Sequence, residues 1–404
     1  MRRYGKMPCM NAQANPDQLS FRESLKPVCF VVAVFVFGML GRSILSPLLP
    51  PIREAFDVSH ARASQLFIVL SLGYGAAMLL SGFVSARLTH RRTIVLSACV
   101  MSAALAWMAV SPALGMFRAG VAILGAGFGL YPPSGISTVT DLVRPADWQK
   151  ALAIHELGPH LGMIGAPLYA NVLLMLTGWR VALAVLAVML LAVAWAFSRG
   201  VPPRERYGEA PTLRTLAPIL TKPRFWILVL LFGMALGSTD GIYLMIPSFL
   251  VSEAGFSLVA ANNVFGVSRF LPIAALLSAV FIVDRIGRRT AMFVALVGTG
   301  LAVLLIGLSS GAPLIVAVFL QPSIGALFFP AGFATLSAVA PPRSRNVAVS
   351  VALPFSALIG IGLIPAWLGL MSDLAGFREG FVLVGTVIAA AALLTVALGP
   401  VRDS

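Results

Sequence analysis

The stretch SRGVPPRERYGEAPTLRTLAPILTKPR, residues 198–224, is the longest polar interruption in a chain made mostly of apolar runs. Six apolar runs precede it and six follow it, near residues 28–49, 63–86, 93–111, 114–138, 150–174, 180–198, 225–247, 257–282, 291–309, 313–338, 347–370 and 378–400. An α-helix needs about 20 apolar residues to cross the hydrocarbon core of a bilayer. The pattern therefore predicts an all-α membrane protein with twelve transmembrane helices, divided six and six by this stretch.

The composition supports the same class of protein. The 404 residues are 59% hydrophobic and 11% charged, with a mean hydropathy of +0.93, which leaves too little polar surface for a soluble protein. The net charge of +14 comes from Lys and Arg at the ends of apolar runs, so we expect no nucleic-acid partner. The three cysteines show no paired spacing, so we expect no disulfide framework, no metal site and no cofactor.

The distribution of Lys and Arg predicts how the chain is oriented. With the N-terminus inside, 22 of the 29 Lys and Arg residues lie on the cytoplasmic side and two lie within spans. Five lie on the outer side: Arg53, Arg62, Arg118, Arg180 and Arg378. Positive residues favour the cytoplasmic side, so we expect both termini to be cytoplasmic and the protein to be integral to a bacterial inner membrane. No small-residue cleavage site follows the first apolar run, which favours a retained N-terminal tail over a signal peptide.

The second half of the chain repeats the first at an offset of 198 residues. Uncommon residues align at this single shift: Arg87 with Arg285, Arg91 with Arg289, Pro132 with Pro330, Gly162 with Gly360, Pro167 with Pro365, and TGWR (177–180) with AGFR (375–378). Six spans separate the copies, so the halves are parallel repeats. We expect a tail at 1–26, a six-helix bundle at 27–198, a cytoplasmic linker at 199–224, a second bundle at 225–400 and a C-terminus at 401–404.

Two loops carry a resemblance to a known family. The second-half loop DRIGRR (284–289) and its first-half copy GFVSARLTHRR (82–92) resemble the cytoplasmic loop signature of the major facilitator superfamily of secondary transporters. The matching positions are Gly82, Arg87, Arg91, Asp284, Arg285, Gly287, Arg288 and Arg289. The resemblance implies that the acidic residue of this signature, which is Asp284 in the second-half loop, helps to hold the cytoplasmic side of the protein closed. The first copy has Ala86 at that position and Thr89 at the glycine.

Ionisable residues inside spans are functional candidates, because lipid cannot solvate them. Arg42 and Asp240 are 198 residues apart and each lies roughly 22 Å of helical rise from the start of its span, beyond the midplane. The resemblance implies that spans 1 and 7 face each other, so we expect an outer gate or substrate site, or alternatively a fixed salt bridge. Arg269 lies roughly 18 Å into span 8. Its planar fork suits a carboxylate or phosphate, which favours a substrate anchor over a partner for Asp240 or Glu156.

Span 5 contains HELGPH (155–160). A zinc protease needs His-Glu-x-x-His, whereas these histidines are five apart and about 140° around the helix, so we expect neither a metal site nor an enzyme. Glu156 and His160 share a face, and with His155 they are candidates for carrying a coupling proton, the alternative being a structural pair. Tyr131 and Tyr74 are candidates for substrate binding or for packing.

These residues favour a monomeric, proton-coupled carrier that moves a small, monocarboxylate-like organic anion by alternating access. We expect its partners to be that substrate, a coupling ion and the lipid bilayer. The motif GPHLG (158–162) instead suggests a proton-driven exporter of drugs or cationic compounds. A third reading is a membrane receptor or scaffold that does not transport, since a fold does not determine function.

Overall fold

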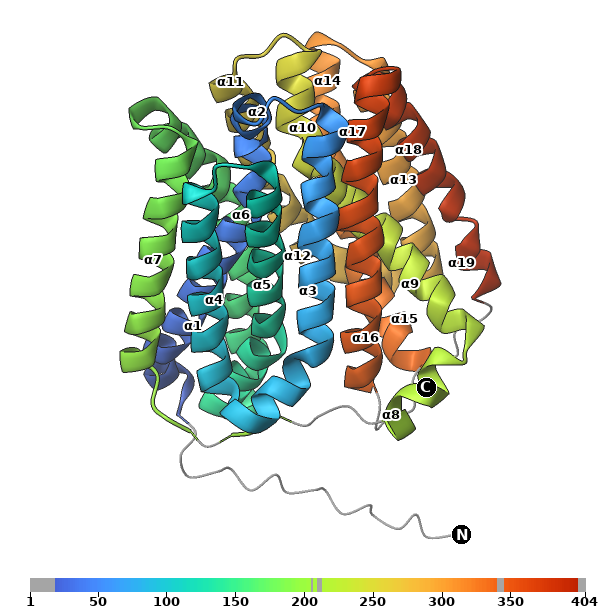
Figure 1. The fold of residues 1–404 in the computed structure, drawn as a ribbon. Helices are drawn as coiled ribbons and strands as arrows, with labels where there is room; N and C mark the ends of the chain where they lie inside the picture. Colours follow the sequence, from blue (N-terminus) through green and yellow to red (C-terminus); the bar gives the residue numbers. More distant parts are fainter. Residues whose placement is uncertain (1–18, 205, 209–212, 340–344, 399–404) are drawn as a thin grey trace, which may run out of the picture.

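The computed structural model describes residues 19–204, 206–208, 213–339 and 345–398. Within these residues, twelve helical segments are long and apolar enough to cross a membrane, which confirms the predicted number of spans. Figure 1 shows the helices of the first half, coloured blue to green, standing beside those of the second half, coloured yellow to red. Most of the expected tail (1–18), part of the linker (205 and 209–212) and the expected C-terminus (401–404) lie outside the described residues.

The first group forms spans 1 to 6, and span 1 consists of two helices. Its elements are α1 (Phe21–Ser43), α2 (Leu45–Ala55), α3 (His60–Leu88), α4 (His90–Val110), α5 (Leu114–Leu142), the short η1 (Pro145–Asp147), α6 (Trp148–Leu176) and α7 (Trp179–Gly200). Each apolar run becomes a helix because a backbone in lipid must satisfy its own hydrogen bonds.

The second group begins with a short helix, α8 (Leu213–Leu220), in the linker. Spans 7 to 12 follow, several of them interrupted. Their elements are α9 (Pro223–Leu236), η2 (Gly237–Gly241), α10 (Ile242–Ser252), α11 (Leu258–Val267), α12 (Leu271–Ile286), α13 (Arg288–Leu308), α14 (Gly311–Ala326), α15 (Phe328–Val339), α16 (Arg345–Ala357), η4 (Leu358–Leu363), α17 (Ile364–Leu374), α18 (Phe377–Ala391) and α19 (Leu394–Ala397). Both η2 and η4 are π-helical. We call the end of the molecule near α8 the linker end, and the opposite end the far end (Figure 1).

The turns at the far end show the repeat in atomic detail. The guanidinium Nη1 of Arg180 donates to the carbonyl oxygens of Ala109, at 3.3 Å, and Ser111, at 2.8 Å. The Nη1 of Arg378 makes the same two bonds 198 residues later, to Gly307, at 3.3 Å, and Ser309, at 2.7 Å. The sequence match of TGWR with AGFR therefore reflects one turn used twice.

The loops of the linker end also repeat their backbone. Gly287 has φ 81° and ψ 151°, and Thr89, at the equivalent place, has φ 72° and ψ 155°. A β-branched residue with positive φ is an outlier, since this region of the backbone map is nearly reserved for glycine. The first half thus keeps the turn although it has lost the glycine.

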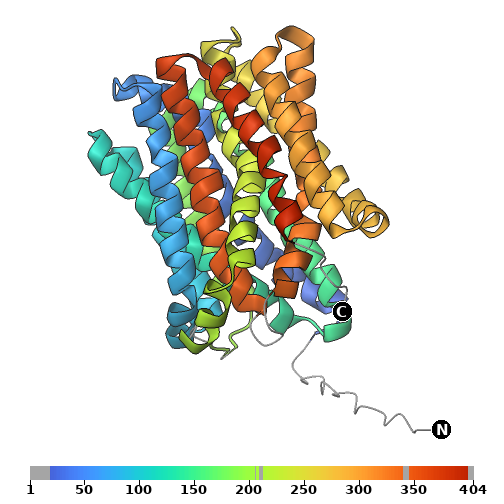
Figure 2. The same cartoon turned by 90° about the vertical axis from the view of Figure 1, so that its right-hand side faces the viewer.

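The two groups meet along spans 2 and 11. Helix α3 packs against α16, η4 and α17, and Figures 1 and 2 both show these helices running alongside one another. At the far end, the Asp373 carboxylate of α17 accepts the backbone N–H groups of His60 and Ala61, at 3.1 and 2.8 Å. A carboxylate at a helix N-terminus is stabilising, so this contact joins the two groups at their far ends.

Spans 5 and 8 meet on the other side. Asn171 of α6 donates to the side chain of Asn263, at 3.0 Å, and accepts from that of Asn262, at 2.8 Å. Helix α11 packs on α6, whereas α12, the other part of span 8, packs on α13, α14 and α15 of its own group. Span 8 therefore changes its packing partners at the break between α11 and α12.

Candidate functional site

Three spans are interrupted where the sequence placed charges. Arg42 lies in the last turn of α1, two residues before the break at Ile44. Asp240 lies within the π-helical η2, and Arg269 lies in the turn that separates α11 from α12. Hydropathy predicted continuous spans at these places. Interrupted helices at membrane depth supply backbone polar groups to a binding site, so the breaks add to the case for these charges.

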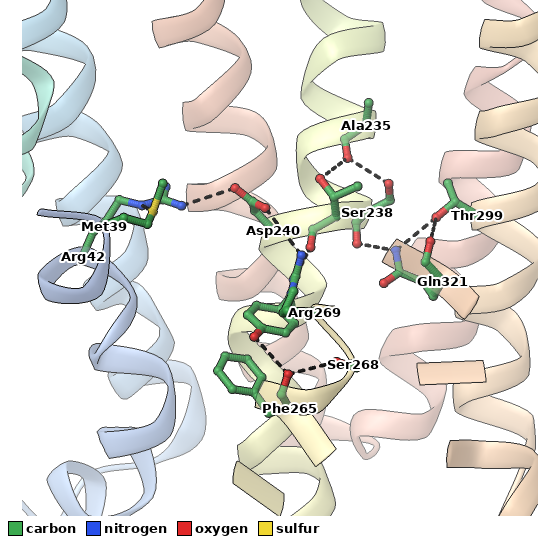
Figure 3. Close-up of polar contacts among 12 residues, drawn as sticks. Met39, Arg42, Ala235, Ser238, Asp240, Phe265, Ser268, Arg269, Thr299 and Gln321 are labelled. Carbon is green, nitrogen blue, oxygen red and sulfur yellow. Dashed lines mark hydrogen bonds and ion pairs between the residues drawn. The ribbon is translucent and has the colours of Figure 1, made fainter. Parts of the chain in front are cut away.

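Asp240 lies between the two arginines (Figure 3). Its Oδ2 is 3.3 Å from Nη2 of Arg42, and its Oδ1 is 4.0 Å from Nη1 of Arg269. The side chains of Arg42, Asp240 and Arg269 are 8%, 19% and 6% exposed. One carboxylate therefore faces two buried guanidinium groups, and the cluster has an excess of one positive charge. We call these three residues the charge triad.

Arg269 makes two further contacts but keeps one donor unused. Its Nη2 donates to the carbonyl oxygen of Thr239, at 2.5 Å, and its Cζ lies 3.0 Å from the centroid of the Tyr243 ring. Its Nε is buried and has no hydrogen-bond partner within the described residues. A buried donor without a partner costs about 1–3 kcal/mol, so this group is suited to an additional acceptor.

The Arg42 guanidinium contacts a thioether sulfur and an aromatic ring of the first group. Its Nε donates to Sδ of Met39, at 3.3 Å, and its Cζ lies 5.4 Å from the centroid of the Phe128 ring. The half-buried Tyr74 packs on Phe128, with the ring centroids 5.7 Å apart, and interacts electrostatically with Arg42 and Asp240. Tyr74 therefore lies beside the triad.

The candidate proton carriers of α6 are paired differently from the sequence hypothesis. His155 is 1% exposed, and its Nδ1 lies 3.2 Å from Oε1 of Glu156, whose side chain is 58% exposed. Within the described residues, no hydrogen bond or ion pair joins Glu156 to His160. His160 is within electrostatic range of Arg269, Asp240 and Glu156. Pro159 does not break α6, which is continuous from Trp148 to Leu176.

Tyr131 belongs to the interior of the first group. It is 2% exposed; its hydroxyl donates to the carbonyl oxygen of Val31, at 2.9 Å, and lies 3.0 Å from Nε2 of His155. Its ring lies 4.7 Å from that of Phe35, between centroids. Both the ring and the hydroxyl of Tyr131 therefore contact residues of the first group.

The loop-motif residues lie at the linker end. Arg91 donates from Nε to the carbonyl oxygen of Val201, at 3.1 Å, and from Nη2 to that of Ser198, where it stabilises the C-terminus of α7. Asp284 is exposed near the end of α12. The other motif positions are exposed or partly exposed: Gly82, Arg87, Arg285, Gly287, Arg288 and Arg289.

Sequence reasoning missed Gln321, a buried residue of α14. Its Nε2 donates to the carbonyl oxygen of Ser238 in η2, at 2.5 Å, and to Oγ1 of Thr299, at 3.0 Å. A glutamine within the apolar run 313–338 was a signal that could have found it, since a buried amide needs partners. The described residues hold no group of three or more His, Cys, Asp or Glu side chains that could bind a metal.

Comparison with known proteins identifies a matching family model and several similar proteins. The model of the Major Facilitator Superfamily matches residues 31–281 and 261–404. The uncharacterized transporter YgaY of Escherichia coli O157:H7 is 27% identical over 180 residues. That match spans 44% of this chain and less than half, 45%, of the relative.

Two relatives match over longer stretches. The hexuronate transporter of Bacillus subtilis is 24% identical over 286 residues, 67% of each chain. The transcription regulatory protein OpdE of Pseudomonas aeruginosa is 26% identical over 416 residues, 95% of this chain and 96% of its own. Among solved structures, a bacterial homologue of the lysosomal transporter Spinster, in an inward-facing and unoccupied conformation, superposes with a TM-score of 0.80 at 18% identity, covering 94% of this chain and 98% of that one.

Proposed function

We propose, from the premise that this chain belongs to the Major Facilitator Superfamily of membrane transporters, that it carries a small organic anion by alternating access. The family membership confirms the resemblance seen in the loops, and the chain is not an enzyme. The observation that carries the proposed substrate class is the charge triad, in which a single carboxylate faces two buried guanidinium groups.

The charge balance of the triad favours an anion. A buried ion pair is tolerated when its charges are matched and its hydrogen-bonding groups are satisfied, and neither condition is met here. Arg269 has an unused Nε donor, and a guanidinium can bind a carboxylate through two parallel hydrogen bonds. A substrate carboxylate at Arg269 would supply both the missing charge and the missing acceptor. A cationic drug would add to the excess positive charge, which argues against the exporter reading.

One of the similar proteins suggests which organic anion to test first. The printed name of the Bacillus subtilis relative is hexuronate transporter, and a hexuronate is a sugar that carries one carboxylate. We therefore propose a carboxylate-bearing substrate of similar size, and D-glucuronate is a suitable first probe. This choice keeps the monocarboxylate-like class that the intramembrane arginines predict.

The packing of span 8 supports a model of the transport cycle. At the far end the two groups are joined by Asp373 on the N-terminus of α3 and by Asn171 between α6 and α11. Helix α12 packs within its own group, which would leave the linker end free to separate. We propose that the described state is closed at the far end, with the linker end and both termini facing the cytoplasm of a bacterial cell, and that rocking of the two groups exposes the triad to each side in turn.

Proton coupling is the proposed role of the α6 cluster. Glu156 is largely exposed and contacts His155, while His160 lies in the electrostatic field of Arg269 and Asp240. Histidine titrates near neutral pH, so protonation of this cluster would change the potential at the triad. We propose that protons and substrate communicate through this field.

The test is the substitution Arg269→Lys, which keeps the charge but removes the planar fork. We expect uptake of D-glucuronate into reconstituted vesicles, driven by an inward proton gradient, to fall about 10- to 100-fold, since a hydrogen bond to a charged group contributes about 1.5–3 kcal/mol. Thermal unfolding of the purified variant should stay close to wild type. Arg118→Lys is the matched control, because Arg118 lies near the far end and donates to Arg62 and Gln65. Unchanged uptake by the Arg269 variant would refute the anchor assignment.

A second candidate function is supported by the match to OpdE, whose printed name is transcription regulatory protein and which aligns with 95% of this chain. On this reading the fold senses a ligand without moving it. The two functions are separated by comparing binding with flux. A rise in unfolding temperature with D-glucuronate, together with the absence of uptake under any gradient, would favour the receptor.

A further inference from the structure

The charge triad depends on an irregular turn of span 7. In η2 the backbone N–H of Ile242 donates to the carbonyl oxygen of Gly237, five residues back. An α-helix uses the residue four back, so the wide turn adds one residue. One residue corresponds to about 100° of rotation, and the wide turn therefore decides which way Asp240 points. Single π-turns inside α-helices are uncommon and frequently occur at functional sites.

Two successive carbonyl groups of the turn accept hydrogen bonds from side chains of other spans (Figure 3). The carbonyl oxygen of Ser238 accepts from Nε2 of Gln321, and that of Thr239 accepts from Nη2 of Arg269, both at 2.5 Å. Buried carbonyl groups need partners, and an opened helical turn leaves such groups available to side chains. Gln321 and Arg269 thus hold adjacent peptide groups of η2 from two directions.

The position of Gln321 is itself well determined. The side chain is 3% exposed, and Oγ1 of Thr299 accepts from its Nε2, at 3.0 Å, and donates to its backbone carbonyl oxygen, at 3.1 Å. Helix α14 can approach η2 closely because Gly325 follows one turn later. A Cβ atom on Gly325 would lie 2.6 Å from Cγ2 of Thr239. The amide therefore reaches Ser238 from a rigid support.

We propose that Gln321 is a positioning residue of the transporter: it holds the wide turn of span 7 and so directs Asp240 toward Arg42 and Arg269. It acts through the backbone of Ser238, two residues before Asp240. Its importance for transport rests on the proposed function, whereas its effect on the Arg42–Asp240 pair does not. Arg269 holds the same turn only while it is bound to Thr239, so a substrate that engages Arg269 would leave Gln321 to maintain the direction of Asp240.

The experiment measures the coupling between Arg42 and Asp240 with and without Gln321. Arg42→Gln, Asp240→Asn and the double variant are compared by thermal unfolding of the purified protein, and the non-additive part of the shift is the coupling. We expect a coupling of at least ~2 °C in the wild-type background and its loss in the Gln321→Leu background. The matched control is Ser356→Ala. It removes a buried hydrogen bond from the Ser356 hydroxyl to the carbonyl oxygen of Val229, at 2.8 Å. Val229 lies on span 7, as Asp240 does, but away from the wide turn. This control should lower the unfolding temperature and leave the coupling intact.

A conservative variant separates positioning from general destabilisation. At pH 5 the carboxylic acid of Gln321→Glu can donate to the Ser238 carbonyl in place of the amide, so this variant should retain the coupling, and it remains usable if the leucine variant does not fold. Intact coupling in the leucine variant, equal loss of coupling in Ser356→Ala, or loss in the glutamate variant at pH 5 would each overturn the proposal. D-glucuronate uptake is measured in parallel. Absent uptake with the expected coupling pattern would reject the proposed function and leave the positioning role standing.

Discussion

Arg180 and Arg378 make the same pair of hydrogen bonds in the two halves of the molecule, whereas Arg42 and Asp240, which are related by the same shift of 198 residues, carry opposite charges. The first pair lies in far-end turns, and each arginine supports the turn of its own half. The second pair lies where span 1 meets span 7, and each residue contacts the other. Nearby, Ser46 donates to the carbonyl oxygen of Leu244, again 198 residues away, at 2.8 Å.

The difference shows where a duplicated fold keeps its halves alike and where it does not. A turn within one half can use the same residue in both copies, because the two turns never meet. Equivalent residues that face each other across the repeat axis cannot both be arginine without repulsion. Spans 1 and 7 differ at this position, and their difference produces the ion pair on which the proposed function rests.

The strongest way to break this comparison is to exchange the charges of the facing pair. Arg42→Asp places a second carboxylate against Asp240, at a buried site where an unmatched charge costs about 3–5 kcal/mol. We expect D-glucuronate uptake to fall more than ~100-fold, the equivalent of about 2.7 kcal/mol. Combining it with Asp240→Arg restores an ion pair between positions 42 and 240 and the net charge of the triad, and should bring uptake back to within ~10-fold of wild type. The control is Arg53→Asp, at the partly buried end of α2 and outside the triad. A double variant as inactive as the single one would argue against direct pairing.

Substitutions in the two far-end turns should have a smaller effect, and they test whether Arg180 and Arg378 stabilise their turns equally. Arg180→Ala and Arg378→Ala each remove two hydrogen bonds to backbone carbonyl groups, so each should lower the stability by about 2 kcal/mol, and by similar amounts. Uptake should persist in both, since neither residue touches the triad. Thermal unfolding of the two purified variants gives the comparison directly. If one variant unfolded normally while the other was strongly destabilised, the two turns would not be structural equivalents.

The smallest expected effect is a change in stability at the linker end, where Thr89 and Gly287 occupy equivalent places in the two halves. Thr89 and Gly287 share a positive φ, which costs a non-glycine residue about 1–3 kcal/mol. Thr89→Gly should relieve this strain. The flexibility of glycine in the unfolded chain and the loss of the hydrogen bond from the Arg92 N–H to the Thr89 hydroxyl offset part of the gain. We expect the free energy of unfolding to rise by about 0.5–1 kcal/mol. Gly287→Thr should lower the stability instead. Thermal unfolding of both variants is the measurement, and shifts of the same sign would contradict it.

Hydropathy and the internal repeat predicted a large part of this protein. The twelve spans follow from the bilayer, because each crossing needs about 20 apolar residues that satisfy their own backbone hydrogen bonds. The 198-residue shift identified Arg42 and Asp240 as equivalent positions, and it matched Arg180 with Arg378. These are properties of spacing and residue type, which a linear sequence displays.

Contacts between distant helices supplied the rest. An α-helical turn and a π-helical turn have the same hydropathy, so the wide turn that directs Asp240 becomes visible only with its partners, Gln321 on α14 and Arg269 before α12. The spacing of Glu156 and His160 suggested a pair, whereas in the structure His155 contacts both Tyr131 and Glu156. A buried polar group binds whichever partner folding brings within reach, and that choice depends on distances through space rather than along the chain.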